Sequence, residues 1–358
     1  MKNKMKAYSL IVIALLILGV MPAVLAAHVG GESGITISTE DFAPRVWMCD
    51  NRVVTDDLVE PGTTPDSALV ERQQNYAFEG ESIQWSVLVM DKNGINKVED
   101  VFGTIGDSQG AGNEIEVNCV EDLGRTGIDE SCNARILEEQ LTNFSSTVMR
   151  YYTCTLTIET PESMQGEYWI TVEALDLDGL SGTMDENEFW FLNPEIALSI
   201  DGDIDFEDVR PGTTSYSSTI LVGNDAESGS GVRMEMYIAG TNFYDSDSSG
   251  AMCPTSNVLN LSNFGYFATN GYYSTLNVGG VGPGARDSEG YMGIPSGERI
   301  DQAKEIIGTE TYSTRIVSNV GNVLTPGSEM ALTFKLNLPE PCNGDFDTGS
   351  IFFWGEAI

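Results

Sequence analysis

Histidine and lysine are scarce in this sequence, and their scarcity excludes several kinds of chemistry. The chain has one histidine, His28, and 18 lysine and arginine residues against 54 acidic ones. Ser-His-Asp catalysis, Cys-His catalysis and histidine-based metal centres need imidazole groups held in a folded core, so one histidine near the N-terminus excludes them. The formal charge of −36 argues against binding nucleic acid or anionic lipid, since both are bound through lysine and arginine.

Phosphate-binding loops and internal membrane spans are also absent. The glycine-rich stretch 279–284 contains Pro283 and lacks a flanking strand and helix, so it is interpreted as a flexible loop. Beyond the N-terminal region no run of about 18 apolar residues occurs, so we expect no membrane insertion of the mature chain. Among 54 acidic residues no catalytic carboxylate pair can be singled out, which makes a carboxylate-based hydrolase the least favoured function.

The N-terminus has the pattern of an export signal. Three lysines precede an apolar run over residues 8–20, and small side chains at Val24 and Ala26 permit cleavage before Ala27. The alternative is an uncleaved anchor helix, but the run is short for a bilayer span of about 20 residues. We therefore expect residues 1–26 to be a signal peptide and the mature protein to be secreted and to act at the cell surface.

The acidic excess needs neutralisation once the chain is compact. Salt or bound cations would screen the repulsion between carboxylates, which points to a saline or calcium-rich exterior. The alternative is that the acidic surface serves solubility alone.

Period-two alternation of apolar residues dominates the sequence and predicts β-strands. The predicted strands are 83–90, 115–119, 152–158, 168–174, 232–238 and 330–338. The first of these is apolar on both faces, as expected of a central strand. Only two short helices are predicted, over 133–144 and 296–307. The expected fold class is all-β, with two Ig-like or jelly-roll-type β-sandwich domains and long loop insertions.

A repeated Pro-Gly-Thr-Thr step, at 61–64 and 211–214, indicates two modules with a boundary near Asn193-Pro194. The expected organisation is a signal peptide at 1–26, an N-terminal extension at 27–74, a sandwich at 75–193 and a second sandwich at 194–358 with an insertion at 242–297. That insertion lacks periodicity and is long for an ordinary connection. It is either a decorated surface loop or the place of contact with a partner.

An even number of cysteines, six, in an exported chain predicts disulfides, although six cysteines permit 15 connectivities. Cys253 and Cys342 are the only cysteines of the second module, so we expect them to pair. Cys119 and Cys154 lie on the apolar faces of two predicted strands and are expected to bridge them. Cys49–Cys132 is then the remaining pair.

Clustered aspartates are candidate calcium ligands, because calcium prefers carboxylate oxygens and a sharp turn at glycine. Asp245, Asp247 and Ser249 match the start of a calcium loop, but Ser256 replaces the acidic residue of an EF-hand. Further candidates are Asp176, Asp178, Asp201, Asp203, Asp205 and the Asp345-Phe-Asp347 step. The alternative is a set of polar turns in an acidic protein. No other cofactor is expected.

Two further kinds of site are indicated. Asn143 and Asn260 begin glycosylation sequons. The candidate ligand-stacking aromatics of the insertion are Tyr266, Phe267, Tyr272 and Tyr273. They either stack on sugar rings or pack the insertion against the sandwich.

Several strings resemble uncharacterised secreted proteins of small-genome archaea. They are Trp47-Met-Cys-Asp-Asn-Arg-Val-Val54, Val89-Met-Asp-Lys-Asn-Gly-Ile95, Ala174-Leu-Asp-Leu-Asp-Gly179 and the segment 338–349. The resemblance implies an archaeal cell surface and carries no established activity. The second module, from Asp205-Phe through Pro211-Gly212 to Val222-Gly-Asn224, is loosely similar to filament subunits of the TasA/camelysin type.

The sequence thus predicts a non-catalytic structural or adhesive component of the cell surface. Its expected partners are other surface proteins or copies of itself. The alternatives are an extracellular module that binds a glycan or solute and, least favoured, a carboxylate-based hydrolase.

Overall fold

The protein is described from a computed structural model, in which residues 42–358 form one compact unit separate from residues 1–41. The described residues are 38–55, 70–72, 74–110, 113, 115–133, 140–184, 189–207, 209–247, 250–277, 286–297, 302–308 and 320–358. The predicted signal peptide at 1–26 and the candidate ligand Ser249 lie outside them.

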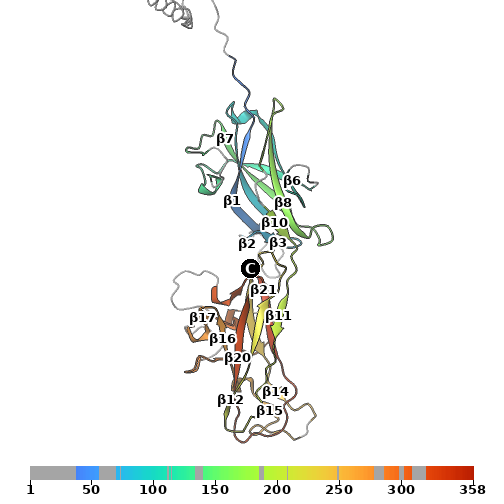
Figure 1. The fold of residues 1–358 in the computed structure, drawn as a ribbon, viewed down its shortest axis with the longest axis vertical. Coiled ribbons are helices and arrows are strands. Elements are labelled where there is room, and N and C mark those ends of the chain that lie inside the picture. The colour runs from blue at the N-terminus through green and yellow to red at the C-terminus, as the bar shows by residue number, and fades with distance from the viewer. Residues whose placement is uncertain are drawn as a thin grey trace, which may run out of the picture. The chain divides into compact units, whose positions relative to one another are not determined.

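Strands and short 3-10 helices make up the regular structure of the described residues, so the predicted all-β class is confirmed (Figure 1). The strands before residue 193 are β1 (Arg45–Thr55), β2 (Val70–Arg72), β3 (Tyr76–Ala77), β4 (Ser82–Met90), β5 (Val98–Gly106), β6 (Ile115–Asp122), β7 (Met149–Thr157), β8 (Gly166–Asp176), β9 (Ser181–Met184) and β10 (Phe189–Leu192). The later strands are β11 (Leu198–Asp201), β12 (Thr214–Asn224), β13 (Met234–Gly240), β14 (Phe243–Tyr244), β15 (Val258–Leu259), β16 (Phe264–Asn270), β17 (Tyr273–Ser274), β18 (Met292–Gly293), β19 (Val323–Leu324), β20 (Glu329–Asn337) and β21 (Ile351–Ala357).

The first ten strands form one continuous sheet, in the order β2-β1-β4-β7-β6-β5-β8-β10-β3, with β9 paired to β8. All of its strand pairs are antiparallel except β10 with β3. The sheet curls round an apolar core that includes Trp85, Ile105, Ile170 and Trp190. A curled sheet therefore replaces the two separate layers of a simple sandwich in this part of the chain.

Strand β4 lies between β1 and β7 and is buried on both faces, as its unbroken apolar pattern predicts. One face, with Val87 and Val89, packs in the core of the curled sheet. The other face, with Leu88 and Met90, packs against Trp47 in a second, smaller cluster. The connection between β6 and β7 supplies further side chains to that cluster, so it covers what would otherwise be an exposed apolar face.

The predicted N-terminal extension needs correction for residues 45–55. These residues form β1, which pairs with β4 over nearly its whole length and contributes the buried Trp47 and Val54. The register shifts between Cys49 and Arg52. This break in the pattern divides one strand into two short apolar pieces in the sequence, which hides its length.

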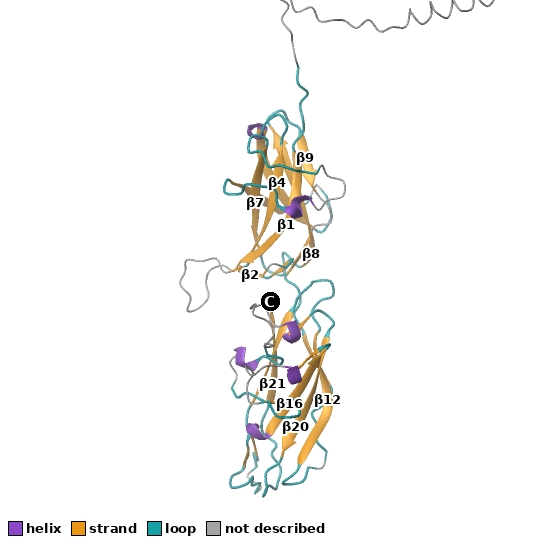
Figure 2. Cartoon of the chain, turned by 90° about the vertical axis from the view of Figure 1, so that its left-hand side faces the viewer, coloured by secondary structure: helices purple, strands orange, loops and turns teal. Residues whose placement is uncertain are grey.

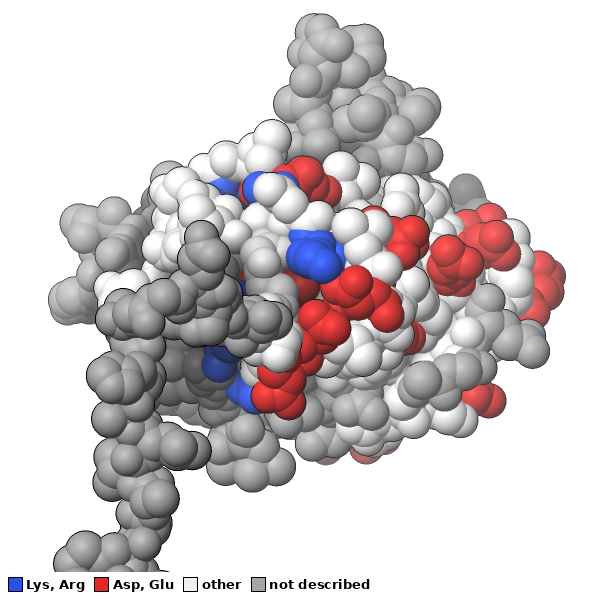
Figure 3. Space-filling model, turned by 90° about the horizontal axis from the view of Figure 1, so that it is seen from above, with Lys and Arg blue, Asp and Glu red and all other residues white. Residues whose placement is uncertain are grey.

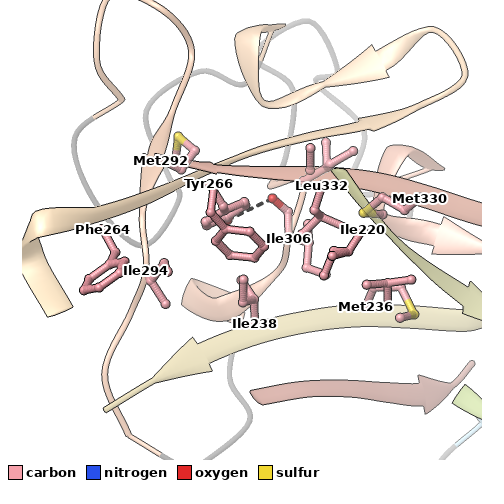
Figure 4. Packing of buried hydrophobic residues seen from close by; sticks show 14 of the residues in the cluster. Ile220, Met236, Ile238, Phe264, Tyr266, Met292, Ile294, Ile306, Met330 and Leu332 are labelled. Atoms are coloured by element: carbon pink, nitrogen blue, oxygen red, sulfur yellow. Dashed lines mark hydrogen bonds between the residues drawn. The ribbon is translucent and has the colours of Figure 1, made fainter. Parts of the chain in front are cut away.

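The later strands form a large sheet, β11-β12-β20-β16-β17 with β18 beside β16, and a small sheet, β19-β13-β21. A separate pair joins β14 to β15. Strand β20 alternates between buried and outward residues along its length. Its buried Leu332 lies in the same core cluster as Met236 and Ile238 of β13 (Figure 4), and Phe334 of β20 belongs to that cluster too. The predicted boundary near Asn193-Pro194 falls between β10 and β11, and no described strand pairs across it. The division into two domains remains a prediction.

The predicted insertion at 242–297 needs correction, because it contains a central strand. Strand β16 pairs with β20 over six residues and turns Phe264, Tyr266 and Ala268 into the core. Its outward positions include the apolar Phe267, so the segment does not read as alternating apolar and polar residues. The insertion is thus part of the sheet and not only a surface loop.

The two predicted helices are only partly within the described residues. The 3-10 helices are η1 (Ile95–Lys97), η2 (Glu130–Asn133), η3 (Leu261–Asn263), η4 (Thr275–Asn277), η5 (Gln302–Lys304) and η6 (Val320–Asn322) (Figure 2). Of the span 133–144, residue 133 ends η2 and residues 140–144 are irregular, while 134–139 lie outside the described residues. Of the span 296–307, residues 302–304 form η5, and residues 296, 297 and 305–307 are not helical. Residues 298–301 lie outside the described residues.

Three disulfides join the predicted partners. They are Cys49–Cys132, Cys119–Cys154 and Cys253–Cys342. The second pair bridges the neighbouring strands β6 and β7, whose residues 119 and 154 are register partners. The third pair ties the connection after β14 to the segment before β21.

Replacing Cys253 and Cys342 together by alanine should lower the free energy of unfolding by about 4–5 kcal/mol on the chain-entropy account, because the bond spans 89 residues. The same change at Cys119 and Cys154, which are 35 residues apart, should cost roughly 1 kcal/mol less. Urea unfolding of both variants measures the difference. A Cys253/Cys342 variant as stable as the unaltered protein would contradict the expectation.

Candidate functional site

An aromatic surface lies on the outward face of the large later sheet. We define it by Tyr216 on β12, Phe267 on β16 and Tyr291 just before β18. The register places Tyr216 opposite Lys335 of β20, and Lys335 opposite Gly265 of β16, so these positions form one row across the sheet. Tyr216 is 47 % exposed, which leaves a large apolar ring on the surface.

Tyr291 is the centre of this surface. Its ring lies 5.6 Å from that of Tyr216 and 5.7 Å from that of Phe267, at tilted angles. It reaches this position because the row contains Gly265. A Cβ atom on that residue would stand 3.4 Å from the Cβ of Tyr291 and 3.1 Å from the carbonyl oxygen of Met292. The glycine therefore allows β18 to lie close against β16.

An ion-pair network supports the aromatic surface. Lys335 Nζ lies 2.8 Å from Asp287 Oδ2 and 2.7 Å from Glu289 Oε2, and its side chain is only 12 % exposed. The ammonium is also 5.3 Å from the ring centre of Tyr291 and 5.9 Å from that of Tyr216. The Tyr216 hydroxyl donates to Glu289 Oε2 at 2.9 Å. Lysine, carboxylates and rings therefore hold one another in place.

The charges of this network follow from its contacts. The hydrogen bonds to Asp287 and Glu289 raise the pKa of Lys335 well above its ordinary value. Hydrogen bonds from Lys335 and Tyr216 lower the pKa of Glu289. Partial burial alone would raise the pKa of Asp287. The hydrogen bonds from Lys335 and from the backbone of Tyr291 and Glu289 outweigh this effect, so the pKa of Asp287 is lowered. Both carboxylates are therefore ionised at neutral pH and act as hydrogen-bond acceptors.

The arrangement suits holding a flat, partly apolar group. The rings offer stacking area, and the carboxylates offer acceptors at the rim, a combination typical of binding sites. Sequence reasoning missed Tyr216 and Tyr291. Tyr216 lies in a run of serines and threonines, and Tyr291 lies in a segment without periodicity, so neither carries a pattern that marks it.

The predicted stacking aromatics have different places. Tyr266 is fully buried and donates its hydroxyl to the carbonyl of Ile306 at 2.9 Å, so of the two alternatives it follows the second and packs in the core (Figure 4). Phe267 belongs to the aromatic surface. Tyr272 is 84 % exposed in the turn after β16, and the half-buried Tyr273 meets it edge-on at 5.9 Å between ring centres.

The predicted calcium loop at Asp245 is closed by its own hydrogen bonds. Asp245 Oδ1 accepts the N–H of Asp247, and Oδ2 accepts those of Gly250 and Ala251, each at 3.1 Å. Asp347 accepts from the backbone and hydroxyl of Ser246 at 2.9 and 2.8 Å. These aspartates thus stabilise turns. Whether calcium binds there remains a prediction.

The other predicted ligands lie in turns or at strand ends. Asp201, Asp203 and Asp205 are exposed, and Asp205 Oδ1 accepts the N–H of Glu207 at 2.8 Å. Asp178 pairs with Lys97 at 2.6 Å, and its neighbour Asp176 is buried. Within the described ranges, no group of three or more His, Cys, Asp or Glu side chains is placed to hold a metal ion.

The glycosylation candidates Asn143 and Asn260 are both exposed, and their modification remains a prediction.

A polar pocket of about 360 Å³ lies in the connection after β6, where Arg125, Asp129 and Tyr151 line it. Arg125 lies 4.8 Å from the ring centre of Tyr151 and donates to Ser86 at 2.6 Å. The pocket's one lining carboxylate, Asp129, is paired with Arg125 at 3.4 Å. This pocket therefore does not present a carboxylate pair.

Comparisons with known proteins give no family. No protein-family model matches the chain, and no curated protein matches it. The chain is similar, at 9 % identity and a TM-score of 0.22, to a solved structure described as a chaperone-tip adhesin complex vital for synergistic activation of CFA/I fimbriae biogenesis, over 88 % of this chain and 92 % of that one. A likeness at this level carries no argument.

Across the residues that the structure describes, no helix is long and apolar enough to span a membrane.

Replacing Lys335 by methionine keeps an apolar stem beside the tyrosine rings and removes the ammonium. The pKa values of Asp287 and Glu289 should then both rise, since the main hydrogen-bond donor to each is lost. In the unaltered protein both carboxyl groups have lowered pKa values, so their ionised forms stabilise the fold at neutral pH. This contribution is lost as the pH falls through the pKa values of the folded state. In the Lys335→Met variant the free energy of unfolding should therefore depend less on pH in the acidic range.

Carboxyl titration by NMR measures both pKa values. Lys97→Met is the control, because its partner Asp178 lies in the turn after β8, and it should leave the pKa values of Asp287 and Glu289 unchanged. Unaltered values in the Lys335 variant would contradict the network.

Proposed function

We propose that the protein is a secreted, non-catalytic component of the cell surface with a structural or adhesive role. The observation that carries the proposal is the aromatic surface of Tyr216, Phe267 and Tyr291, presented on a rigid sheet. Exposed aromatic groups on a rigid scaffold are enriched where proteins bind partners. The three disulfides support an oxidising exterior. We propose secretion and an archaeal cell surface as its setting together with this role.

The partner proposed is another surface protein or a second copy of this chain. A chain with a formal charge of −36 repels copies of itself over most of its surface. Association then needs a place where apolar contact area outweighs that repulsion. The aromatic surface meets this need, because Lys335 offsets one of the two carboxylates beside it.

Replacing Tyr216 by serine should lower association about tenfold, as expected for an exposed aromatic anchor of an interface. The readouts are sedimentation velocity of the purified mature protein over a range of concentrations and binding of the labelled protein to cells that produce it. Tyr272→Ser is the matched control, because it removes a tyrosine that is 84 % exposed but lies outside the aromatic surface. An unaltered protein that neither associates nor binds cells would overturn the proposal, and so would equal losses in both variants.

A glycan ligand is the second candidate, favoured by the carboxylates at the rim of the rings. Ionised Asp287 and Glu289 can accept hydrogen bonds from sugar hydroxyls while a ring stacks on Tyr216 or Tyr291. On a glycan array, binding should then appear for the unaltered protein and weaken strongly in both Tyr216→Ser and Glu289→Gln. Retained association with cells and no signal on the array would favour the protein partner.

A further inference from the structure

Two turns of the curled sheet share one sequence pattern and lie beside each other. Asp91 to Gly94 follows β4, and Asp176 to Gly179 begins with the last residue of β8; both read Asp-x-Asn/Asp-Gly. Asp176 is the register partner of Val98, and the N–H of Leu177 donates to the carbonyl of Lys97 at 2.9 Å. Since η1 connects the first turn directly to β5, the pairing of β5 with β8 brings the two turns to the same end of the sheet.

Both leading aspartates are buried, with Asp91 at 0 % and Asp176 at 2 % exposure. Asp176 Oδ1 accepts the N–H groups of Asp178 and Leu180 at 3.0 and 2.7 Å. Asp91 Oδ1 accepts the N–H of Asn93 at 2.7 Å. Oδ1 of Asp91 and Oδ1 of Asp176 therefore both cap a turn in the ordinary way.

Asp91 Oδ2 is different. It is buried, and the described residues offer it no hydrogen-bond partner. Asp245, which is 4 % exposed, shows the contrast, because its Oδ1 and Oδ2 both accept backbone N–H groups. A buried carboxylate oxygen without a partner is costly, so a native structure needs something to compensate it.

The neighbouring charges increase this cost. Burial raises the pKa of Asp91, and the nearby charge of Asp176 raises it further, so that together they outweigh the backbone hydrogen bonds from Asn93 and Gly94, which lower it. The charge of Lys97 lowers the pKa of Asp91 by less than the charge of Asp176 raises it, and the Lys97 ammonium is bound to Asp178 at 2.6 Å. The formal charge of the chain is −36, and acidic side chains cover more of the face seen in Figure 3 than lysine and arginine do.

We propose that Asp91 Oδ2 and the carboxylate of Asp176 together bind one calcium ion, with backbone carbonyls and water completing its oxygen ligands. Calcium accepts carboxylate and carbonyl oxygens in irregular geometry, whereas magnesium demands a near-octahedral set. The ion compensates the buried oxygen and fastens the turn after β4 to the turn after β8. This site is independent of the aromatic surface and of the role proposed for it.

The test is calcium binding by the purified mature protein, measured by titration calorimetry and by thermal unfolding in calcium or in a chelator. The unaltered protein should unfold about 5 °C higher in saturating calcium. Asp91→Asn keeps the acceptor for Asn93 and removes the charge at Oδ2. It should lose one bound calcium and the thermal shift, while in chelator it should be at least as stable as the unaltered protein.

Asp176→Asn is the second variant and should lose the same ion. Asp245→Asn is the control, because Asp245 caps a different loop, and it should keep the shift. A protein indifferent to calcium, whose Asp91→Asn variant is simply more stable, would show that Asp91 holds a proton and would overturn the proposal. Loss of the shift in Asp245→Asn but not in Asp91→Asn would also overturn it, by placing calcium at the other loop.

Discussion

The register of β20 between β12 and β16 determines both the interior and the surface of the later part of the chain. Leu332, Phe334 and Leu336 turn inward from β20, and the alternate residues turn outward. A shift of one residue in either pairing would move Lys335 into the core and Phe334 to the surface. The same pairings place Lys335 between Tyr216 and Gly265. The core and the aromatic surface are therefore two consequences of one pattern of backbone hydrogen bonds.

The structure shows two means of accommodating the excess of acidic residues, and we propose a third. Some carboxylates pair with one of the few lysines, as Asp287 and Glu289 do with Lys335. Others cap turns with backbone N–H groups, as Asp245 does, and such caps work without any basic residue. The chain has only 18 lysine and arginine residues against 54 acidic ones, so pairing with a basic residue cannot serve every carboxylate. Asp91 satisfies only its Oδ1 in this way, and the third means that we propose is a cation bound at its Oδ2.

The strands and the disulfides could be predicted from the sequence, because alternation and cysteine position are local features. The strands β7, β8 and β20 were recognisable by strict alternation. Strand β1 was not, since its pattern breaks at a register shift, and β16 was not, since its outward Phe267 is as apolar as its inward residues. Burial of aromatics is decided by which face of a strand they occupy, so the sequence left open whether Tyr266 packs inside or stacks on a ligand, and its inward position on β16 decides for packing.

The candidate sites depend on contacts that no local pattern records. Lys335 and Glu289 are 46 residues apart, and their contact arises only because β18 packs against β16 beside β20. Asp91 resembles Asp176 in sequence context, and both read as polar turns. What distinguishes Asp91 is an unsatisfied oxygen, which is a property of its surroundings in three dimensions. Sequence can thus identify turns that are able to hold a cation, but only the packing around each carboxylate shows which one still needs a partner.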